Sequence, residues 1–270
     1  MFPFDLLRRK GRAAGSPNSH EHQRDHIHYI TTLRGVLGML RNPEGTEAVF
    51  DIEDGLKDTR AAAGVVTKVL QSPEVAACMR QRYLAEPVDI ETLQRLPRGT
   101  LGAHFAHHIQ EHGFDPDYYR KLPVETDLDW VMLRMRQTHD IWHVVTGIDT
   151  SRLGEIAVKA FELAQTWRPL AAVITSGGMM RYLLKDPDQL GDAMAHISHG
   201  YQLGRHAKPF LAQKWEQGWD VPLTEWRRRV GLPADIPKPG LFQPECEQTL
   251  SPPTPSLDTQ DKQQERGAEQ

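Results

Sequence analysis

Cysteine is scarce in this sequence of 270 residues, which contains only Cys78 and Cys246, far apart in the chain. Two distant cysteines form no CxxC pair of the kind that binds zinc, and they are too few for a disulfide framework. The scarcity therefore favours a reducing compartment. The chain also lacks an apolar run near the roughly 20 residues that a membrane-spanning helix needs. Its first residues, "MFPFDLLRRKGRAAGSPNSH", contain no proper hydrophobic segment of a secretory signal peptide.

A strong excess of charge is missing as well. The formal net charge is -4, which gives the chain no general attraction to nucleic acid, so we expect no nucleic-acid partner. Alternation of apolar and polar residues at period two, the pattern of a half-buried strand, is nearly absent. Apolar residues three or four apart predominate instead, as in Ile27, Ile30, Leu33 and Leu37. The predicted fold class is therefore all-α, a single multi-helix, bundle-like domain.

The two ends of the chain differ from its middle in composition. Residues 1–25 are polar, and the region from Pro233 onward is rich in proline and ends in "SPPTPSLDTQDKQQERGAEQ". Such segments cannot bury enough apolar surface to fold alone. We therefore predict a mobile N-terminal segment at 1–25, a folded domain at 26–232 and a disordered tail at 233–270.

Local signals place the helices within this domain. Ser72 is a predicted N-cap with Pro73 at the first helical position, and Gly113 is predicted to end a later helix. The predicted helices occupy residues 27–40, 55–71, 72–84, 99–113, 127–146, 151–166, 169–185, 187–217 (interrupted near Pro209) and 223–230.

Two histidines lie among apolar residues in the predicted helix 127–146. His139 and His143 are four residues apart, so their imidazoles project from one helical face and can reach a common point. Asp140 occupies an adjoining edge of that face. Ionisable side chains are costly to bury unless they are paired or bind a metal, so this arrangement needs a physical explanation.

A second carboxylate can join the histidines from the next helix. Gly147 is predicted to end the first helix, and Thr150 or Ser151 to cap the second. Glu155 then falls in the first or second turn, with eleven residues between it and His143. Because the connection is short, we expect the two helices to be neighbours and Glu155 to reach back to the histidines.

These four side chains form a candidate metal site. His139, His143, Asp140 and Glu155 supply two imidazoles and two carboxylates, donors that suit zinc and other divalent first-row ions. A cation would also neutralise the buried carboxylates. The spacing leaves two alternatives open. The histidines can be a structural pair without metal, and Asp140 can orient a histidine instead of binding the ion.

Further histidines occur elsewhere with similar spacing. His104 and His108 are four residues apart, with Glu111 and His112 close by, but their surroundings are polar, so we interpret them as a solvated helix face. The remaining group, which is interpreted as ordinary core or surface histidines, contains His196, His199 and His206.

The stretch "HDIWHVVTGIDTSRLGE" fits the pattern HDxxH, eleven residues and Glu, and resembles the ubiquinone (coenzyme Q) biosynthesis protein 4 family. The segments "LPRGTLGAHFAHHIQEHGFDPD", "EIAVKAFELAQTWRP" and "WEQGWDVPLTEWRRRVGL" are also similar to that family, so the resemblance covers about residues 30–232. The segments "SPNSHEHQRDH" and "DPDYYRKLPVE" and the C-terminal tail depart from its pattern. A diverged relative that acts on another lipid therefore stays an alternative.

The resemblance implies an all-α fold and a divalent metal, usually zinc, at His139, Asp140, His143 and Glu155. It implies action on a polyprenylated hydroxybenzoate-type precursor of ubiquinone, by oxidative decarboxylation that replaces the ring carboxylate with a hydroxyl, and we assign Asp140 a catalytic role. It also implies contacts with other enzymes of the pathway and with a membrane surface, in the cytoplasm or on the inner membrane face (the mitochondrial matrix side in a eukaryote). A homodimer is left open.

Two other functions compete with this one. The first is a non-catalytic organiser of quinone-synthesis enzymes that binds prenyl lipid and carries a structural metal. The second, suggested by the HD pair alone, is a metal phosphohydrolase, for which the sequence offers no convincing additional histidine and aspartate ligands.

A prenyl tail requires an apolar slot. The predicted helix "PLAAVITSGGMMRYLL" contains Gly177 and Gly178, which permit close approach of a lipid or, alternatively, of another helix. Basic side chains that could face anionic headgroups, or simply solvent, are Arg181, Lys185, Arg205, Lys208 and Arg227–Arg229.

Overall fold

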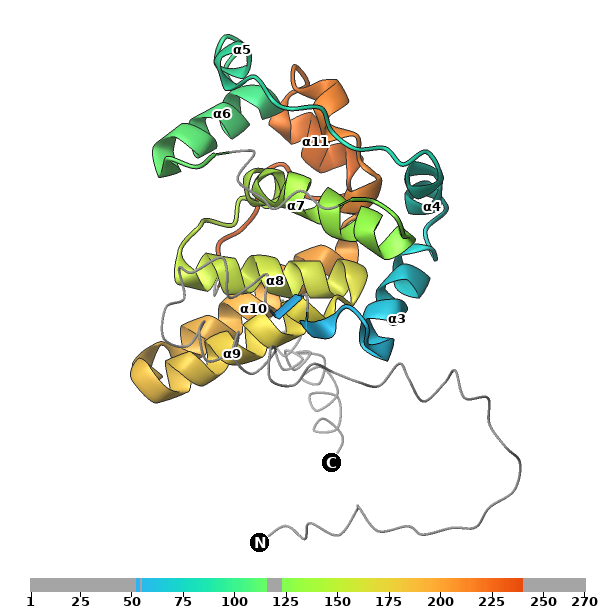
Figure 1. Ribbon diagram of the computed structural model, residues 1–270. Helices are drawn as coiled ribbons and strands as arrows, with labels where there is room; N and C mark the ends of the chain where they lie inside the picture. The colour runs from blue at the N-terminus through green and yellow to red at the C-terminus, as the bar shows by residue number, and fades with distance from the viewer. Residues whose placement is uncertain (1–51, 54, 116–122, 240–270) are drawn as a thin grey trace, which may run out of the picture. The chain divides into compact units, whose positions relative to one another are not determined.

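The computed structural model describes residues 52–53, 55–115 and 123–239. Every regular element within these ranges is a helix, and one isolated β-bridge joins Thr100 to Pro222 (Figure 1). The prediction of an all-α fold is therefore confirmed. Among the described helices, none is both long and apolar enough to cross a membrane. The predicted helix 27–40 and most of the predicted tails lie outside the described residues, and the domain bounds 26–232 stay a prediction.

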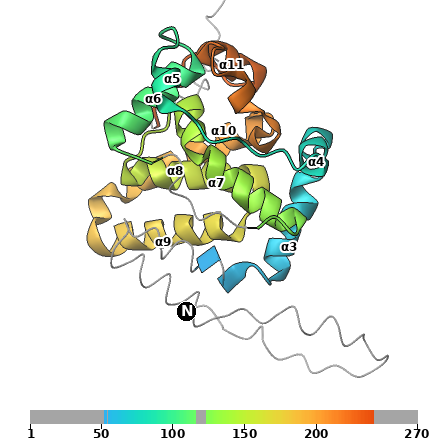
Figure 2. The ribbon, with the colours of Figure 1, turned by 45° about the horizontal axis from the view of Figure 1, so that its top comes forward.

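Nine α-helices with described bounds follow one another along the chain. Their bounds are α3 Arg60–Val69, α4 Pro73–Arg80, α5 Ile90–Gln94, α6 Leu101–His112, α7 Asp127–Thr146, α8 Arg152–Thr166, α9 Pro169–Lys185, α10 Leu190–His206 and α11 Leu223–Arg229. Short 3₁₀ turns occupy Pro187–Gln189, Phe210–Ala212 and Trp215–Gly218. In Figure 1 α7 runs between α6 and α8, and helices α8, α9 and α10 pack side by side below it, as the turned view also indicates (Figure 2).

Most predicted helix bounds agree with the structure, and the differences have local causes. The predicted interruption of 187–217 near Pro209 agrees with the end of α10 at His206, because Pro209 has no backbone N–H, but the residues after it form short 3₁₀ turns and not α-helix. Helix α3 begins later than predicted, because the Thr59 hydroxyl accepts a hydrogen bond from the Ala62 N–H at 3.1 Å. Helix α5 was not predicted, since five residues are too few to show a periodicity.

An aromatic cluster connects α7 to the C-terminal part of the chain. Trp142 meets Phe161 and Phe210 edge to face, with ring centroids 5.5 and 5.7 Å apart. Phe210 contacts Trp215 at 5.0 Å, and Trp215 contacts Trp226 of α11 at 4.8 Å. Such pairs each stabilise a core by roughly 0.5–1.5 kcal/mol beyond the burial of their area. The cluster therefore anchors α7, the helix that carries His139 and His143, through the contacts of Trp142.

Helix α8 approaches α10 unusually closely. A Cβ atom added to Gly200 would lie 2.0 Å from the Ala157 carbonyl oxygen, and one added to Gly204 would lie 2.6 Å from that of Phe161. Backbone therefore packs on backbone at this crossing, and no other residue fits at Gly200 without moving α8. Because α8 bears Glu155, the crossing also fixes the position of that carboxylate.

We expect Gly200→Ala to lower the free energy of unfolding by about 1–3 kcal/mol, because overpacking of a tight contact forces a backbone shift. The measurement is chemical denaturation followed by circular dichroism. Gly191→Ala on the same helix is the matched control, since a Cβ there meets no atom within 4 Å and alanine favours the helix. Equal stability of the two variants would contradict the close crossing.

Buried ion pairs connect the segment before α3 with α7, α8 and α9. Glu162, whose side chain is 1% exposed, accepts hydrogen bonds from Lys159 at 2.9 Å and from Arg168 at 2.8 Å. Arg168 also pairs with Glu53, and Glu53 pairs with Arg136 of α7. Burial acts to raise the pKa of Glu162, but the charges of Lys159 and Arg168 outweigh it and lower the pKa to about 2.

This lowered pKa predicts a pH-dependent loss of stability. The contribution of Glu162 is complete above its unfolded pKa of about 4.5 and disappears as the pH falls through about 2. Glu162→Gln should cost about 3–5 kcal/mol at pH 7, since it leaves Arg168 with one carboxylate fewer in a buried site. Thermal denaturation of both proteins from pH 7 to pH 2 tests this, and the difference in melting temperature should shrink below pH 4.5. A difference that does not depend on pH would be inconsistent with an ionised Glu162.

Candidate metal centre

Local capping signals place the ligands on α7 and α8. Helix α7 begins with a capping box between Thr126 and Asp129 and ends at Gly147, which adopts the left-handed conformation (φ 67°) that glycine tolerates. Helix α8 follows with Ser151 as N-cap, whose Oγ accepts a hydrogen bond from the Gly154 N–H at 3.1 Å. Glu155 therefore lies in the first turn of α8, as the sequence predicts.

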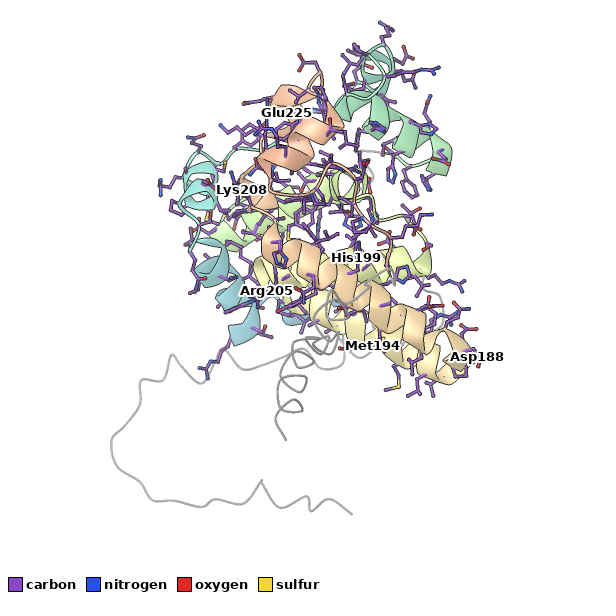
Figure 3. All side chains as sticks on the ribbon, turned by 180° about the vertical axis from the view of Figure 1, so that it is seen from behind. Asp188, Met194, His199, Arg205, Lys208 and Glu225 are labelled. Carbon is purple, nitrogen blue, oxygen red and sulfur yellow. The ribbon has the colours of Figure 1, made fainter. Side chains whose placement is uncertain are left out.

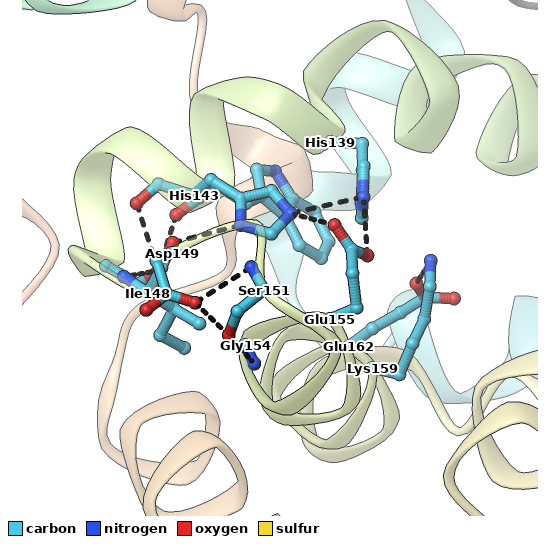
Figure 4. A network of polar contacts seen from close by, with 11 residues as sticks. His139, His143, Ile148, Asp149, Ser151, Gly154, Glu155, Lys159 and Glu162 are labelled. Carbon is cyan, nitrogen blue, oxygen red and sulfur yellow. Dashed lines mark hydrogen bonds and ion pairs between the residues drawn. The ribbon is translucent and has the colours of Figure 1, made fainter. Parts of the chain in front are cut away.

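Three of the four predicted ligands converge on one point (Figure 4). The His143 Nε2 atom lies 3.2 Å from the Glu155 Oε1 atom and 3.3 Å from the His139 Nε2 atom. The Glu155 Oε2 atom lies 3.6 Å from the His139 Nε2 atom. One ligand atom from each residue falls within 4.8 Å of the others, so His139, His143 and Glu155 can hold a metal ion.

The ring of His143 is held by its other nitrogen. Its side chain is 1% exposed, and its Nδ1 atom lies 3.0 Å from the Ile148 carbonyl oxygen just beyond the end of α7. A carbonyl can only accept, so Nδ1 carries the proton and donates it, which leaves the Nε2 lone pair of the neutral ring free for a metal. The sequence motif does not contain this contact, which depends on the turn after Gly147.

Electrostatics couples the three side chains. Burial acts to lower the pKa of His143, but the hydrogen bond and charge of Glu155 outweigh it and raise the pKa. The Glu155 side chain is 41% exposed, yet enough protein atoms surround its carboxylate that burial acts to raise its pKa. Hydrogen bonds from His139 and His143 hold this pKa well below its usual value. The carboxylate therefore favours positive charge beside the histidines, which a proton or a divalent ion can supply.

Asp140 is not one of the three residues whose ligand atoms converge. Its carboxylate raises the pKa of His143 on α7 and also acts on the ring of His108 on α6. Direct binding of a metal by Asp140 therefore stays a prediction. The effect of its charge on His143 is compatible with the alternative in which Asp140 supports a histidine instead of binding the ion.

The interpretation of the α6 histidines as a solvated face is only partly right. His104, His107 and His112 are exposed, but His108 is partly buried, and its ring lies nearly parallel to that of His143 with centroids 5.9 Å apart and an angle of 21°. The partial burial of His108 could be predicted from a helical projection of α6, because His108 lies on the edge of the apolar stripe that includes Phe105.

A cavity of about 870 Å³ adjoins this pair of rings. His108 and His143 line it, together with residues of α6, the end of α7 and α11. At its edge Arg227 of α11 donates from Nε to the Val145 carbonyl oxygen at 2.9 Å, and its guanidinium also reaches the Val144 carbonyl oxygen at 3.4 Å. A cation at a helix C-terminus is favourable. Arg227 thus fixes the end of α7 from which His143 projects.

The third histidine group lies elsewhere, on α10. Figure 3 shows His199 along this helix between Met194 and Arg205, seen from behind. His196 and His206 each bond through Nδ1 to the carbonyl oxygen four residues earlier, at 2.7 Å. These histidines form no group able to hold a metal within the described ranges, in agreement with their interpretation as ordinary histidines.

Comparison with known proteins identifies the family. A sequence model described as coenzyme Q (ubiquinone) biosynthesis protein Coq4 matches residues 29–235. The chain belongs to the Coq4 family. A crystal structure from Nostoc punctiforme PCC 73102, of a protein named for ubiquinone biosynthesis, is 37% identical with a TM-score of 0.69. The match covers 76% of this chain and 98% of that one. The resemblance drawn from the HDxxH pattern is confirmed.

Curated members of the Coq4 family are more distant in sequence. The mitochondrial ubiquinone biosynthesis protein COQ4 of Meyerozyma guilliermondii is 25% identical over 209 residues, which are 74% of this chain and 65% of that protein. The mitochondrial COQ4 homolog of Rattus norvegicus is 31% identical over 168 residues, which are 60% of this chain and 62% of that protein. The chain therefore spans less than two thirds of the length of these relatives.

The geometry predicts binding of about one divalent ion per chain. We expect His139→Ala or His143→Ala to lose most of the bound ion, because each removes one of the three convergent donors found among the described residues. Elemental analysis and calorimetric titration with zinc measure this. His196→Ala, on α10, is the control and should keep full occupancy. Wild-type protein that stays free of metal after incubation with zinc, manganese or iron would contradict the prediction.

Proposed function

We propose that this chain is a metal-dependent enzyme of ubiquinone biosynthesis that acts on a polyprenylated hydroxybenzoate-type ring. Membership of the Coq4 family supports a role in that pathway. The observation that supports catalysis is the open side of the ligand group, where His139 is 27% and Glu155 41% exposed. Catalytic zinc sites typically have three protein ligands and one position for substrate, whereas structural sites are closed by four.

The side chains of this site have distinct roles in the proposed reaction. His139, His143 and Glu155 would hold the ion, and two imidazoles with one carboxylate suit zinc as well as other divalent first-row ions such as iron. When bound, the ion supplies a Lewis acid that can orient the substrate carboxylate and stabilise negative charge. The hydrogen bond to Ile148 keeps His143 in the tautomer that binds metal.

The proposed net reaction releases the ring carboxylate as carbon dioxide and places a hydroxyl at the same carbon. This change is a two-electron oxidation of the ring, so the reaction also consumes an oxidant such as dioxygen. Asp140, next to His139, is the proposed catalytic group, because it adds a negative charge beside the ligand group and can accept a proton. We assign no metal-ligand role to the exposed α6 histidines.

The prenyl tail and a membrane surface are the proposed apolar partners. The end of α9 exposes Met180, Leu183 and Leu184, which are 49%, 53% and 65% accessible. By contrast, a Cβ on Gly178 would lie 2.5 Å from Ile156, so this glycine serves close helix packing. The exposed end of α9, rather than Gly178, is therefore the proposed place for contact with lipid at the inner membrane face.

A non-catalytic organiser of quinone-synthesis enzymes is the alternative proposal. It is supported by the division of the ligands between two helices, since a metal bound by His139, His143 and Glu155 would tie α7 to α8. A metal phosphohydrolase gains no such support, because no second group of metal-binding side chains occurs among the described residues.

The decisive test is Asp140→Asn, which is nearly isosteric and removes one negative charge beside the site. If the site is catalytic, turnover should fall on the order of 10²–10³-fold, as when one stabilising group is lost from an active site. Loss of a carboxylate that only orients a metal ligand lowers metal affinity by about 10–100-fold, and excess metal offsets that loss. The variant is therefore assayed in excess zinc, both with a prenylated hydroxybenzoate under air and by complementation of a strain that lacks this step.

Accumulation of the carboxylated precursor, with fold and metal retained, supports the enzyme. Asp188→Asn, at the start of the turn before α10, is the control and should behave as wild type. Normal quinone production by the Asp140→Asn variant, with no other enzyme that supplies the step, would instead establish the organiser.

A further inference from the structure

His108 has a buried nitrogen without a partner beside the ligand group. Its Nε2 atom is inaccessible to solvent, and no donor or acceptor among the described residues contacts it. An unsatisfied buried polar atom is destabilising, and the large majority of such atoms in native proteins are paired with protein or ordered water. This nitrogen is therefore a place where a ligand group can be expected.

The neighbouring side chains hold the ring of His108 in a fixed position. It lies nearly parallel to His143 of α7, with centroids 5.9 Å apart, and contacts His112 at 4.8 Å and Phe114 at 5.9 Å. In its neutral form the imidazole ring of His108 offers one N–H donor and one nitrogen acceptor, so it can form a hydrogen bond with either kind of partner.

Other histidines of α6 have partners or are exposed to solvent. The Nδ1 atom of His112 bonds the His108 carbonyl oxygen at 2.9 Å. The side chain of His107 is 75% exposed and pairs with Glu111 at 3.6 Å. His108 alone among these three combines an unpaired buried nitrogen with a position in the wall of the cavity next to His143.

We propose that His108 is a specificity-determining residue, which forms a hydrogen bond with the ring hydroxyl of an aromatic acid that lies between α6 and the ligand group. This inference rests on the proposed function, since it takes the carboxylate of the same ring to face the ligand group from the side of His143, which is the one of its three residues that lines the cavity. His108 and His143 line one cavity from neighbouring helices, so a single benzenoid ring can contact both. The cavity thereby selects hydroxylated over unsubstituted benzoates.

The test compares two probes that differ only in this hydroxyl, 4-hydroxybenzoate and benzoate. Their affinities for the full-length protein are measured by calorimetry or ligand-observed NMR, with and without zinc. Wild type should prefer 4-hydroxybenzoate by about 2–10-fold, the net effect of one neutral hydrogen bond. His108→Phe keeps a ring that can stack on His143 but removes both nitrogens. It should abolish the preference and leave both benzoate affinity and zinc content unchanged.

Two further variants separate specificity from structure. His108→Gln, which restores a side-chain donor and acceptor, should recover part of the preference. His107→Phe on the same helix is the matched control and should retain all of it. A preference that survives in His108→Phe, or is missing in wild type with and without zinc, overturns the proposal. Loss of zinc from His108→Phe also overturns it, because His108 would then act by positioning His143. Failure of wild type to bind zinc counts against the proposed function instead.

Discussion

The contact between His143 and Glu155 is the constraint on which the site depends. It joins the last turns of α7 to the first turn of α8, and its 3.2 Å length brings a nearly buried imidazole and a partly exposed carboxylate to one point. Burial opposes the charge of each group, and the opposite charge of its partner outweighs that effect. The pair is therefore favourable only while both helices keep their positions, and the rest of the fold supplies those positions.

Three separate contacts maintain this geometry. The Ile148 carbonyl sets the direction of the His143 ring, and Arg227 binds carbonyl oxygens in the last turn of α7. On the other side, Gly200 of α10 brings the backbone of α8 close. The first two contacts are polar and the third is steric, so the position of the site depends on hydrogen bonding at one end and on packing at the other.

Much of this site could be predicted from the sequence because its determinants are local. Gly147 and Ser151 end one helix and begin the next by well-known capping chemistry, and the spacing of His139, His143 and Glu155 then brings them together. The role of His108 could not be predicted in the same way. It depends on how α6 packs against α7, and residues 108 and 143 are brought together only by tertiary structure.

The close crossing of α8 and α10 has a consequence for variation in this chain. Gly200 touches none of the three ligands, yet a larger residue there must displace Ala157, two positions beyond Glu155 on the same rigid helix. Because the carboxylate moves with its helix, such a change would misalign the donors without altering any of them. A substitution on α10, which carries none of the three ligands, can therefore cause a defect that resembles the loss of a ligand. Inspection of the HDxxH motif alone would overlook such a substitution.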